Sequence, residues 1–449
     1  MEWNGLRILI VGMARSGVAA ALTFAKLGAA VTVCDLKEKK ELREIVAGLE
    51  TAGVSIFAGG YPKVKDNFDL VIPSPGVPAT VTPLKEAASH GIPIWSEIEA
   101  AYRMAQGQLI AVTGTNGKTT TTSLIGQMLK DVNLPVIVAG NIGVPLIGEA
   151  EQSTGQHALV VEVSSFQLEW VEQFRPKVAV MLNITPDHLD RHKTLDNYIK
   201  TKANIFSTQR AIDYTVLNFD DPNVKKMAAL TNAQVIFFSR KHNLEAGVFV
   251  RDGKITIKQE EELPVVAVED IAIKGGHNLE NALAATATAW VMGLTPEEIK
   301  QTLKSFPGVE HRLEPVRTLD GVQYINDSKG TNPDASIKAL EAFQNPIVLI
   351  AGGMSKGSDF SDFAENIKMK ARAVILLGEE AEKLEDTLKD KQFTAIHLVK
   401  NYEEAVPLAQ KLAQPGDIVL LSPACASWDM FSSFEERGKL FKHLVKELG

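Results

Sequence analysis

One stretch of the chain restricts its possible folds more than any other, the run Leu109–Thr122, which reads LIAVTGTNGKTTTT. Its first five residues are apolar or β-branched and predict a buried strand, whereas its four threonines open a predicted helix that runs to Lys130. The loop between them contains two glycines, which let backbone N–H groups turn toward an anion at the positive end of the helix. A strand, such a loop and a helix in this order predict an α/β domain around a parallel sheet.

The loop also carries the side chains that binding of a nucleoside triphosphate requires. Lys118 supplies a positive charge for phosphate oxygens, and Thr119 supplies a hydroxyl that can reach a magnesium ion. A Walker A motif has four residues between its glycines where this loop has two, and a glycine-rich βα turn with a solvated lysine is the structural alternative. The residues that we expect to contact the triphosphate are Gly114, Thr115, Asn116, Gly117, Lys118, Thr119 and Thr120.

Composition excludes several classes of protein. A chain of 449 residues is too long for one compact core and predicts two or three domains. The net charge of −8, without a basic block, argues against nonspecific nucleic-acid binding. Two cysteines, Cys34 and Cys425, cannot build a disulfide framework, and no segment has the ~18 uninterrupted apolar residues of a membrane span. We therefore expect a cytoplasmic monomer with no nucleic-acid partner and no membrane insertion.

The N-terminal part begins like a Rossmann domain. A predicted strand, Arg7–Val11, is followed by the glycine loop 12–17 (GMARSG), and the next strand ends at Asp35, about twenty residues after that loop. Ala14 replaces the middle glycine of the dinucleotide motif and would crowd a pyrophosphate, so a nucleoside-diphosphate substrate and NAD both stay open. Residues 74–78 (SPGVP) follow a third strand, where ligands of open α/β sheets bind, although a plain turn is the alternative.

Polar residues stand at the ends of three further predicted strands within residues 135–182. Asn141 follows the first, Glu162 lies near the end of the second, and His188 follows the third. Because parallel strands open at one edge of a sheet, these side chains should converge there with Lys118. A carboxylate in an apolar strand is costly unless it is paired or binds metal, so we expect Glu162 to be a magnesium ligand, with a structural salt bridge as the alternative.

Two further groups in this region could bind ions. His188 and His192 are four residues apart, but Leu189 stands where zinc proteases have a glutamate, so we reject a zinc site. Lys202 lies beside the apolar stripe of a predicted helix that is capped near Thr194. A lysine that faces inward needs an anion or a chemical modification, and a lysine that extends to the surface is the alternative.

The C-terminal part contains a second α/β pattern. Three apolar strands are predicted at Ile347–Ile350, Ala373–Leu377 and Asp417–Leu421, and Cys425 after the last is expected to be a buried thiol rather than a nucleophile. Hairpin strands are expected within residues 248–273. With boundaries before the central strand and near Pro307, we expect three domains, 1–98, 99–305 and 306–449.

Eight motifs, distributed in order over essentially the whole chain, together resemble one family. They are TGTNGKTTT, GNIGVP, VEVSSFQLE, NITPDHLDRH, GGHNLENALAA, HRLE, NDSKGTNPDA and SPACASWDMF. This set resembles the Mur ligase family, most closely its members that add D-glutamate to UDP-N-acetylmuramoyl-L-alanine.

The resemblance implies a three-domain α/β fold. It comprises a Rossmann-like N-terminal domain for the UDP-substrate, a central P-loop-type mononucleotide-binding domain that uses ATP, and a Rossmann-like C-terminal domain for the amino acid. The implied activity is ATP-dependent amide-bond formation through an acyl phosphate, with release of ADP and phosphate. It would serve peptidoglycan synthesis, on which the cell wall, cell shape and cell division depend.

The resemblance also implies roles for individual residues. Thr119 and Glu162 would share one magnesium ion, and His188 and Lys202 would hold a second, with Lys202 N-carbamylated. Lys329 would steady the transferring phosphoryl group. Further ATP contacts would come from Asn278, Asn281, Arg312 and Asp327. Substrate-binding residues would be Ser16, Asp35, Ser74, Gly76 and Asn141 for the UDP-substrate, Thr331, Lys356, Ser427 and Phe434 for D-glutamate, and Ser164.

Several alternatives to this interpretation remain. Asn278 and Asn281 lie three apart on one predicted helix, where one of them could equally serve as an N-cap. Another amide ligase of the same fold, either a sibling Mur ligase or folylpolyglutamate synthetase, is the nearest alternative function. From other classes, the N-terminal pattern leaves an NAD-dependent dehydrogenase, and the phosphate-type loop leaves a regulator that binds ATP without turnover.

Overall fold

The computed structural model describes the chain except Met1, Asp66 and residues 355–357. The chain forms two compact units. The first unit contains Met1–Asp270 and Glu280–Lys304, and the second contains Ile271–Leu279 and Ser305–Gly449. Each unit is an α/β structure, which confirms the predicted fold class.

The first sheet of the first unit is parallel and has four strands in the order β3-β2-β1-β4. Alternate residues of β1 point to opposite faces, so that Ile8 and Ile10 join one apolar cluster while Leu9 and Val11 join another. Its strands are β1 (Arg7–Val11), β2 (Ala30–Asp35), β3 (Ser55–Ala58) and β4 (Leu70–Pro73). Its helices are α1 (Arg15–Lys26), η1 (Lys39–Glu41), α2 (Arg43–Thr51) and α3 (Thr82–Ser89).

The second sheet of the first unit has nine strands in the order β13-β12-β11-β10-β9-β8-β5-β7-β6. Strands β5 to β11 run parallel to their neighbours, and β12 and β13 add antiparallel hairpins. The strands are β5 (Gln108–Thr113), β6 (Val136–Gly140), β7 (Ala158–Glu162), β8 (Val178–Met181), β9 (Tyr214–Asn218), β10 (Gln234–Ser239), β11 (Gly247–Arg251), β12 (Lys254–Lys258) and β13 (Glu262–Ala267). Strand β5 lies between β7 and β8, which brings the ends of these three strands together.

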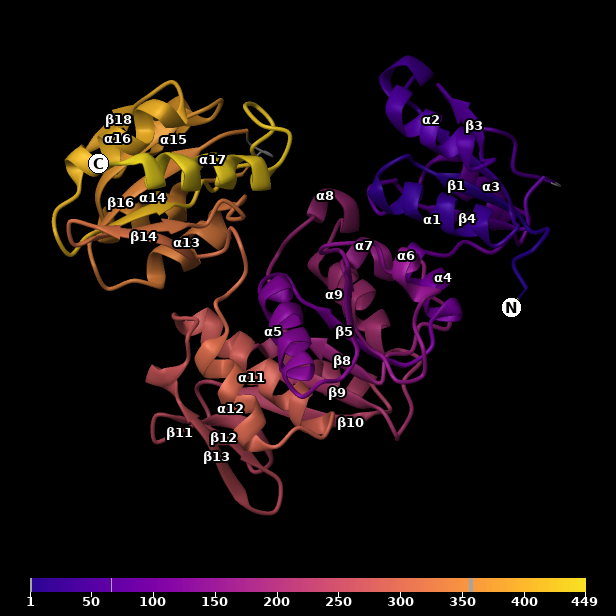
Figure 1. Ribbon diagram of the computed structural model, residues 1–449, viewed down its shortest axis with the longest axis horizontal. Helices are drawn as coiled ribbons and strands as arrows, with labels where there is room; N and C mark the ends of the chain where they lie inside the picture. The colour runs from indigo at the N-terminus through magenta and orange to yellow at the C-terminus, as the bar shows by residue number, and fades with distance from the viewer. Residues whose placement is uncertain (1, 66, 355–357) are drawn as a thin grey trace. The chain divides into compact units, whose positions relative to one another are not determined.

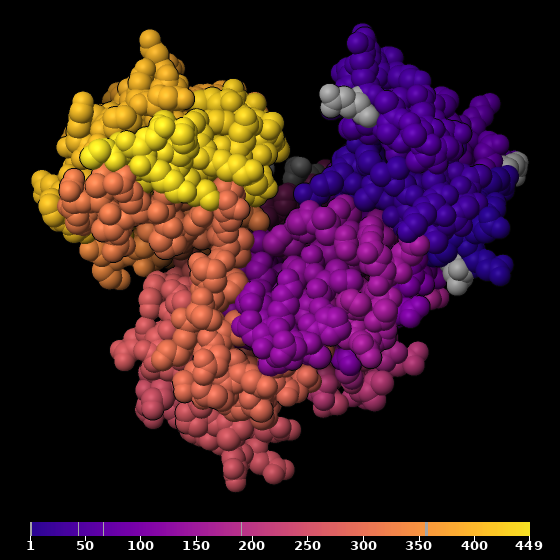
Figure 2. All heavy atoms as spheres, in the orientation of Figure 1, coloured from indigo at the N-terminus to yellow at the C-terminus, as the bar shows by residue number. Residues whose placement is uncertain are grey.

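Helices α5 and α11 lie side by side on this sheet (Figure 1). Thr121 Oγ1 of α5 donates to Asn281 Oδ1 of α11 at 3.2 Å, and Thr302 Oγ1 of α12 donates to Asp131 Oδ2 at 2.5 Å. Segments far apart in the sequence thus form one continuous surface in Figure 2. The helices connected with this sheet are α4 (Glu97–Met104), α5 (Lys118–Asp131), α6 (Leu146–Ala150), α7 (Ser165–Leu168), α8 (Leu189–His192), α9 (Leu195–Ala203), η2 (Asn204–Phe206), α10 (Pro222–Lys226), η3 (Met227–Leu230), η4 (Val268–Asp270), α11 (Gly276–Val291) and α12 (Pro296–Ser305).

The second unit is built on one six-stranded sheet in the order β14-β15-β19-β16-β17-β18, in which only β14 and β15 pair antiparallel. Alternate residues of β16 enter two apolar clusters, one on each face. Its strands are β14 (Glu314–Leu319), β15 (Val322–Asn326), β16 (Ile347–Gly352), β17 (Ala371–Leu377), β18 (Ile396–Leu398) and β19 (Ile418–Leu421). Its helices are α13 (Pro333–Glu341), α14 (Ser361–Lys370), α15 (Ala381–Asp390), α16 (Tyr402–Leu412) and α17 (Phe434–Glu447).

The strands predicted from apolar runs are present and differ from the expectation only at their ends. Residues expected as hairpin material form β11, β12 and β13. Sequence reasoning missed β3, an edge strand whose residues are alternately exposed and half-buried. None of the helices among the described residues has the length and apolarity to cross a bilayer. The three domain boundaries stay predictions.

A buried carboxylate fixes the polypeptide before the central sheet. Glu99 in α4 is fully buried and accepts backbone N–H groups from Glu172, Gln173 and Phe174 at 2.8–3.0 Å. Arg103 Nε donates to the same carboxylate at 2.7 Å. One buried carboxylate thus binds three successive backbone N–H groups of the loop 172–174, away from water.

We expect Glu99→Gln to lower the free energy of unfolding of the first unit by about 2–4 kcal/mol, because an amide NH₂ would face backbone donors and Arg103 would keep only its exposed charge partner Glu172. Urea unfolding followed by fluorescence measures this change. The matched control is Glu151→Gln, because Glu151 pairs with Lys26, whose side chain is 66% exposed; there the loss should be below about 1 kcal/mol. Equal effects of the two substitutions would contradict the assignment.

Candidate functional site

The loop between β5 and α5 is held in a conformation that requires glycine. Gly117 has a φ of 85°, and a Cβ atom there would lie 2.2 Å from Asn281 Oδ1. Gly114 has a φ of 153°, and its Cβ would lie 2.9 Å from Leu182 Cβ. The two glycines therefore let this loop approach the end of β8 and helix α11 closely.

The turn after β8 binds the same loop through its backbone. Asn183 O accepts the Thr115 N–H at 2.9 Å, and Asn183 Oδ1 accepts the Asn116 N–H at 2.8 Å. Asn183 Nδ2 in turn donates to Asn116 O at 3.1 Å, and Thr115 Oγ1 donates to Thr185 O at 3.1 Å. The expectation that the loop turns its N–H groups toward an anion is thus wrong for Thr115 and Asn116, because Asn183 takes both donors.

The carbonyl oxygens of the loop face two lysines. Lys118 Nζ donates to Gly114 O at 2.9 Å and to Thr115 O at 2.7 Å. Lys202 Nζ, in α9, donates to Gly114 O at 2.9 Å and to Thr113 Oγ1 at 3.1 Å. Thr194 caps α9 as expected, accepting from the Asn197 N–H. The structure therefore places Lys202 inward, against the loop, and not at the surface.

Lys202 has an unusual electrostatic environment. Its side chain is fully buried, and burial together with the nearby charge of Lys118 holds its pKa well below the ordinary value for lysine. The carboxylates of Asp187 and Glu162 act in the opposite direction on this pKa, with smaller effect. Deprotonation of this amine is therefore easier than for an exposed lysine, and the neutral form is the nucleophilic one.

Glu162 and Asn141 meet at the carboxyl edge of the sheet, as predicted. Asn141 Nδ2 donates to Glu162 Oε1 at 2.9 Å, and the Asn141 N–H donates to Glu162 O at 2.9 Å. The Glu162 side chain is buried, as are Thr119 and Thr120 in the first turn of α5. Thr120 Oγ1 is buried and finds no hydrogen-bond partner among the described residues. This edge therefore presents a carboxylate and threonine hydroxyls, which are hard oxygen ligands.

His188 lies in a short turn beside an aromatic ring. Its φ of 51° is left-handed, and its ring centroid lies 4.8 Å from that of Phe166. Its side chain is 45% exposed, and Nε2 lies 3.5 Å from Asp187 Oδ2. His192, by contrast, is buried, with Nε2 3.0 Å from Ser165 Oγ. The two histidines thus occupy different environments.

Ser164 begins the turn after β7. Its hydroxyl accepts the Gln167 N–H at 3.3 Å, while Gln167 Oε1 accepts the Ser164 N–H at 3.0 Å, which forms a capping box. Gln167 Nε2 then donates to Glu97 Oε2 at 3.4 Å, and Glu97 Oε1 accepts the Ile147 N–H at 2.7 Å. A buried acid in α4 thus supports the turn that carries Ser164.

Of the residues expected to contact the UDP-substrate, Asn141 lies at the central sheet, and the other four lie in the N-terminal sheet or in the loops and helix beside it. Asp35 Oδ2 accepts the Met13 N–H at 2.8 Å, which places the carboxylate on the glycine loop. Ser74 Oγ donates to Gly12 O at 2.9 Å and so joins the loop 74–78 to the glycine loop. Ser16 is half-buried in the first turn of α1, and Gly76 is exposed. The structure thus brings Asp35 and Ser74 to the same glycine loop.

In the second unit, a buried arginine holds together two of the predicted segments. Arg437 donates from Nε and Nη2 to Oγ and O of Ser328, at 2.9 and 2.7 Å, and from Nη1 to Cys425 O at 3.2 Å. Ser328 Oγ donates to Phe434 O at 2.8 Å, and Lys329 Nζ lies 5.4 Å from the centroid of the Phe434 ring. Lys329 and Phe434 are therefore neighbours on this scaffold.

The other predicted residues of the second unit differ in burial and in their neighbours. Asp327 is buried, and burial, opposed by the Arg312 charge, raises its pKa to about 6. Ser427 is buried, and Thr331 is half-buried beside Lys329, whose carbonyl accepts its N–H at 2.9 Å. Asn278 and Arg312 line one pocket of about 150 Å³. Lys356 lies outside the described residues.

Comparisons with known proteins agree with this geometry. A family model described as the Mur ligase middle domain matches residues 112–289, and one described as the Mur ligase, glutamate ligase domain matches residues 311–425. A relative from Pelotomaculum thermopropionicum, named UDP-N-acetylmuramoylalanine--D-glutamate ligase, is 51% identical over 449 residues, which cover 100% of this chain and 99% of the relative. The chain belongs to the Mur ligase family. A Clostridioides difficile protein of the same name is 46% identical over all of both chains.

Solved structures of Mur ligases share the fold. UDP-N-acetylmuramate-alanine ligase from Thermotoga maritima superposes with a TM-score of 0.61 at 21% identity, covering 98% of this chain and 99% of that one. MurF ligase from the same organism, solved in complex with ADP, gives a TM-score of 0.60 at 18% identity, with 93% and 95% coverage. The three-domain α/β fold expected from the sequence motifs is the fold of this family.

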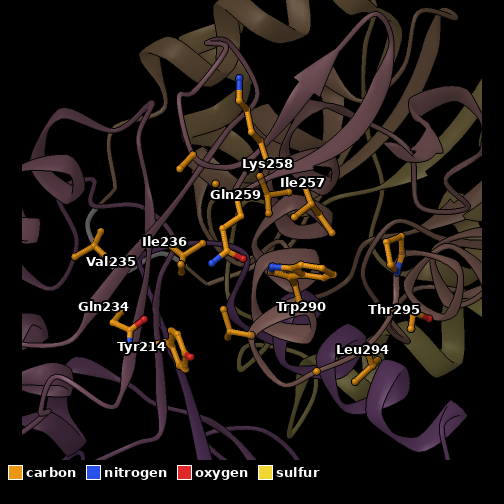
Figure 3. A pocket seen from close by; sticks show the side chains of 16 residues that line it. Tyr214, Gln234, Val235, Ile236, Ile257, Lys258, Gln259, Trp290, Leu294 and Thr295 are labelled. Atoms are coloured by element: carbon orange, nitrogen blue, oxygen red, sulfur yellow. The ribbon is translucent and has the colours of Figure 1, made fainter. Parts of the chain in front are cut away.

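One pocket of this Mur ligase lies away from the predicted site residues. A cavity of about 570 Å³ opens at the amino ends of β9 and β10, at Tyr214 and Gln234, with Trp290 and Gln259 pointing into it (Figure 3). Strand β10 pairs with β11 only at Phe238 and Ser239, so the two strands separate beside this cavity. None of the predicted site residues lines it.

Sequence reasoning missed Asn183, Arg437 and Glu97 in this Mur ligase. Asn183 gives no periodic signal, because it follows the last residue of a strand and acts through both its backbone and its amide. Arg437 and Glu97 are charged residues in helices, where charge predicts an exposed face. Only the presence of Asn183 and Arg437 in or near family-like motifs could have drawn attention to them.

The buried Glu97 predicts a pH dependence of stability. Burial, opposed by the Ile147 N–H and the Gln167 amide, raises its pKa from 4.5 to about 7. The folded state then binds more protons than the unfolded state between these values, so the contribution of Glu97 falls as pH rises through that window. From about pH 5 to about pH 7.5, the unmodified chain should lose about 2 kcal/mol relative to Glu97→Gln, which cannot ionise. Parallel pH profiles in urea unfolding would contradict this.

Proposed function

We propose that this Mur ligase joins D-glutamate to UDP-N-acetylmuramoyl-L-alanine at the expense of ATP, in the cytoplasmic stage of peptidoglycan synthesis. The observation that carries the proposal is the convergence of Lys118, Glu162 and Lys202 on one phosphate-type loop at the carboxyl edge of the central sheet. Full-length relatives named for this reaction support the choice of amino acid.

The reaction begins by bringing anions together. The carboxylate of the UDP-substrate attacks the γ-phosphate of ATP, which forms an acyl phosphate and releases ADP, and the D-glutamate amine then displaces phosphate. Lys118 supplies positive charge for the phosphate oxygens. In the structure its Nζ atom donates to carbonyl oxygens of its own loop. Thr120 Oγ1, buried without a described partner, gains an acceptor when a phosphate oxygen lies beside it.

The residues present fit magnesium. Thr119 and Glu162 are buried oxygen donors at the start of α5 and the end of β7, and they would hold one ion. His188 and a carbamylated Lys202 would hold a second. The ions would neutralise charge between the substrate carboxylate and the triphosphate.

Carbamylation fits the environment of Lys202. The neutral amine, favoured by the low pKa, attacks carbon dioxide; a C–N bond forms, one proton is released, and the side chain ends in a carboxylate. This change removes a positive charge beside Lys118 and replaces it with the oxygen ligands that a divalent ion prefers.

The remaining roles belong to the other parts of the chain. The pocket with Asn278 and Arg312 is suited to the ATP base and phosphates, with Asn281 and Asp327 as further ATP contacts. Lys329 would steady the phosphoryl group. D-Glutamate would bind near Phe434 with Thr331, Ser427 and Lys356, and the UDP-substrate near Asp35, Ser74, Ser16, Gly76, Asn141 and Ser164. We further propose a monomer with domains 1–98, 99–305 and 306–449, whose last domain closes on the central one to protect the acyl phosphate from water.

A phosphate-release assay tests the reaction directly. With ATP, magnesium and UDP-N-acetylmuramoyl-L-alanine, we expect release of phosphate to require D-glutamate, because only the correct amine completes the cycle. L-Glutamate, L-lysine and a folate substrate with L-glutamate serve as controls. Strong release with L-lysine and none with D-glutamate would overturn the proposal in favour of a sibling ligase.

Replacement of the buried lysine tests the role of carbamylation. We expect Lys202→Ala to reduce kcat at least about a hundredfold while the fold, followed by circular dichroism, is retained, because a group that would hold a metal ion is lost whereas Gly114 O keeps Lys118 as a donor. In ¹³C-bicarbonate, the unmodified chain should show a carbamate carbon resonance that is absent from the variant. Full activity of Lys202→Ala would overturn the proposed role of Lys202, whereas ATP binding without turnover in the unmodified chain would favour a regulator.

A further inference from the structure

The side chain of Arg191 joins two loops of the first unit. Its Nε and Nη2 atoms lie 3.0 and 2.5 Å from the two carboxylate oxygens of Glu169, a bidentate pair. Its Nη1 atom donates to Val77 O at 2.7 Å. Because both side chains of the pair are only 15% exposed, water screens this contact weakly. One guanidinium thus binds the residue after α7 and the backbone of loop 74–78.

The loop at Val77 is joined to the glycine loop by hydrogen bonds. The Val77 N–H donates to Ser74 O at 2.9 Å, and Ser74 Oγ donates to Gly12 O at 2.9 Å. A Cβ atom on Gly12 would lie 3.1 Å from Val77 Cγ2, which shows how closely the two loops approach. A displacement of Val77 therefore displaces the segment on which the UDP-substrate is proposed to bind.

The turn that carries His188 depends on contacts from outside. Helix α8 has only four residues, and both flanking residues, His188 and Lys193, have left-handed φ values of 51° and 70°. Non-glycine residues in this region cost about 1–3 kcal/mol each, so surrounding structure must hold them. Within the turn, the Arg191 N–H donates to His188 O at 3.0 Å, and the Arg191 guanidinium lies 5.4 Å from the Phe166 ring that His188 also contacts.

We propose that Arg191 is a positioning residue that couples loop 74–78 to the turn of His188, so that binding of the UDP-substrate sets the position of His188. The inference rests on the proposed function. It adds to that function a structural connection between the UDP-substrate site and the magnesium site proposed at His188. Arginine is required because one planar fork must bind a carboxylate with two nitrogens and a carbonyl with a third. Lysine can satisfy only part of this geometry.

Hydrogen exchange of the ligand-free protein tests the coupling itself. In Arg191→Met, which keeps an apolar stem but loses the fork, we expect faster exchange in both segments, 74–80 and 186–194. Arg191→Lys should give an intermediate change. The matched control is Arg251→Met, which breaks the ion pair of Arg251 with Glu262 in the antiparallel strands and should leave both segments unchanged. Faster exchange in 186–194 alone would overturn the coupling.

Kinetics test its effect on the reaction. For Arg191→Met we expect KM for UDP-N-acetylmuramoyl-L-alanine to rise about tenfold and kcat to fall about tenfold, while KM for D-glutamate changes less than about twofold. Glu169→Gln should reproduce part of both changes, and the double variant should lose less than the product of the two. A rise in KM with unchanged kcat would mean that Arg191 supports only loop 74–78. That result would overturn the proposed coupling to His188.

The two proposals fail in different ways. If the unmodified chain releases no phosphate with D-glutamate, the proposed function fails, whereas the exchange comparison needs no substrate and still decides the role of Arg191. If phosphate release is normal but Arg191→Met exchanges and reacts like the unmodified chain, the function stands and the coupling is wrong.

Discussion

The first unit depends on how the carbonyl oxygens of one short loop are satisfied. Gly114 O accepts from two lysines, Thr115 O from one, and Asn116 O from the amide of Asn183. Carbonyl oxygens that pointed outward would repel a phosphate, so their occupation by donors is what makes the loop suitable for an anion. The need to provide donors for these carbonyl oxygens fixes the positions of three elements. They are the buried lysine of α9, the end of β8 and the start of α5.

The same requirement explains why the charged form of Lys202 is destabilised. Lys202 is buried and shares one carbonyl oxygen with Lys118, so burial first and repulsion by Lys118 second lower the pKa of Lys202, and both follow from the geometry that shapes the loop. A modification that turns this amine into an anion would relieve the repulsion. Structure of the loop and chemistry of the site are therefore two results of one arrangement.

Much of this could be predicted from the sequence, and the failures have a common cause. Strand positions were predictable because buried parallel strands are continuous apolar runs, and the convergence of Asn141 and Glu162 followed from the parallel sheet alone. The buried contacts of Glu97, Glu99 and Arg437 could not be predicted, because helical periodicity places charged residues at the solvent-exposed face. Their partners are backbone groups that lie far away in the sequence. Residue type therefore indicates candidates for ligand contacts, but not the distant groups that hold those candidates in place.

Asn281 and Gly117 illustrate a constraint of another kind. The amide oxygen of Asn281 occupies the place where any Cβ on residue 117 would have to be, and it also accepts from Thr121 of the neighbouring helix. Neither residue can be enlarged while the other stays as it is. A larger residue at position 117 therefore needs a smaller one at position 281, so a phosphate loop transplanted from another protein should fit only beside a helix α11 that leaves the same space.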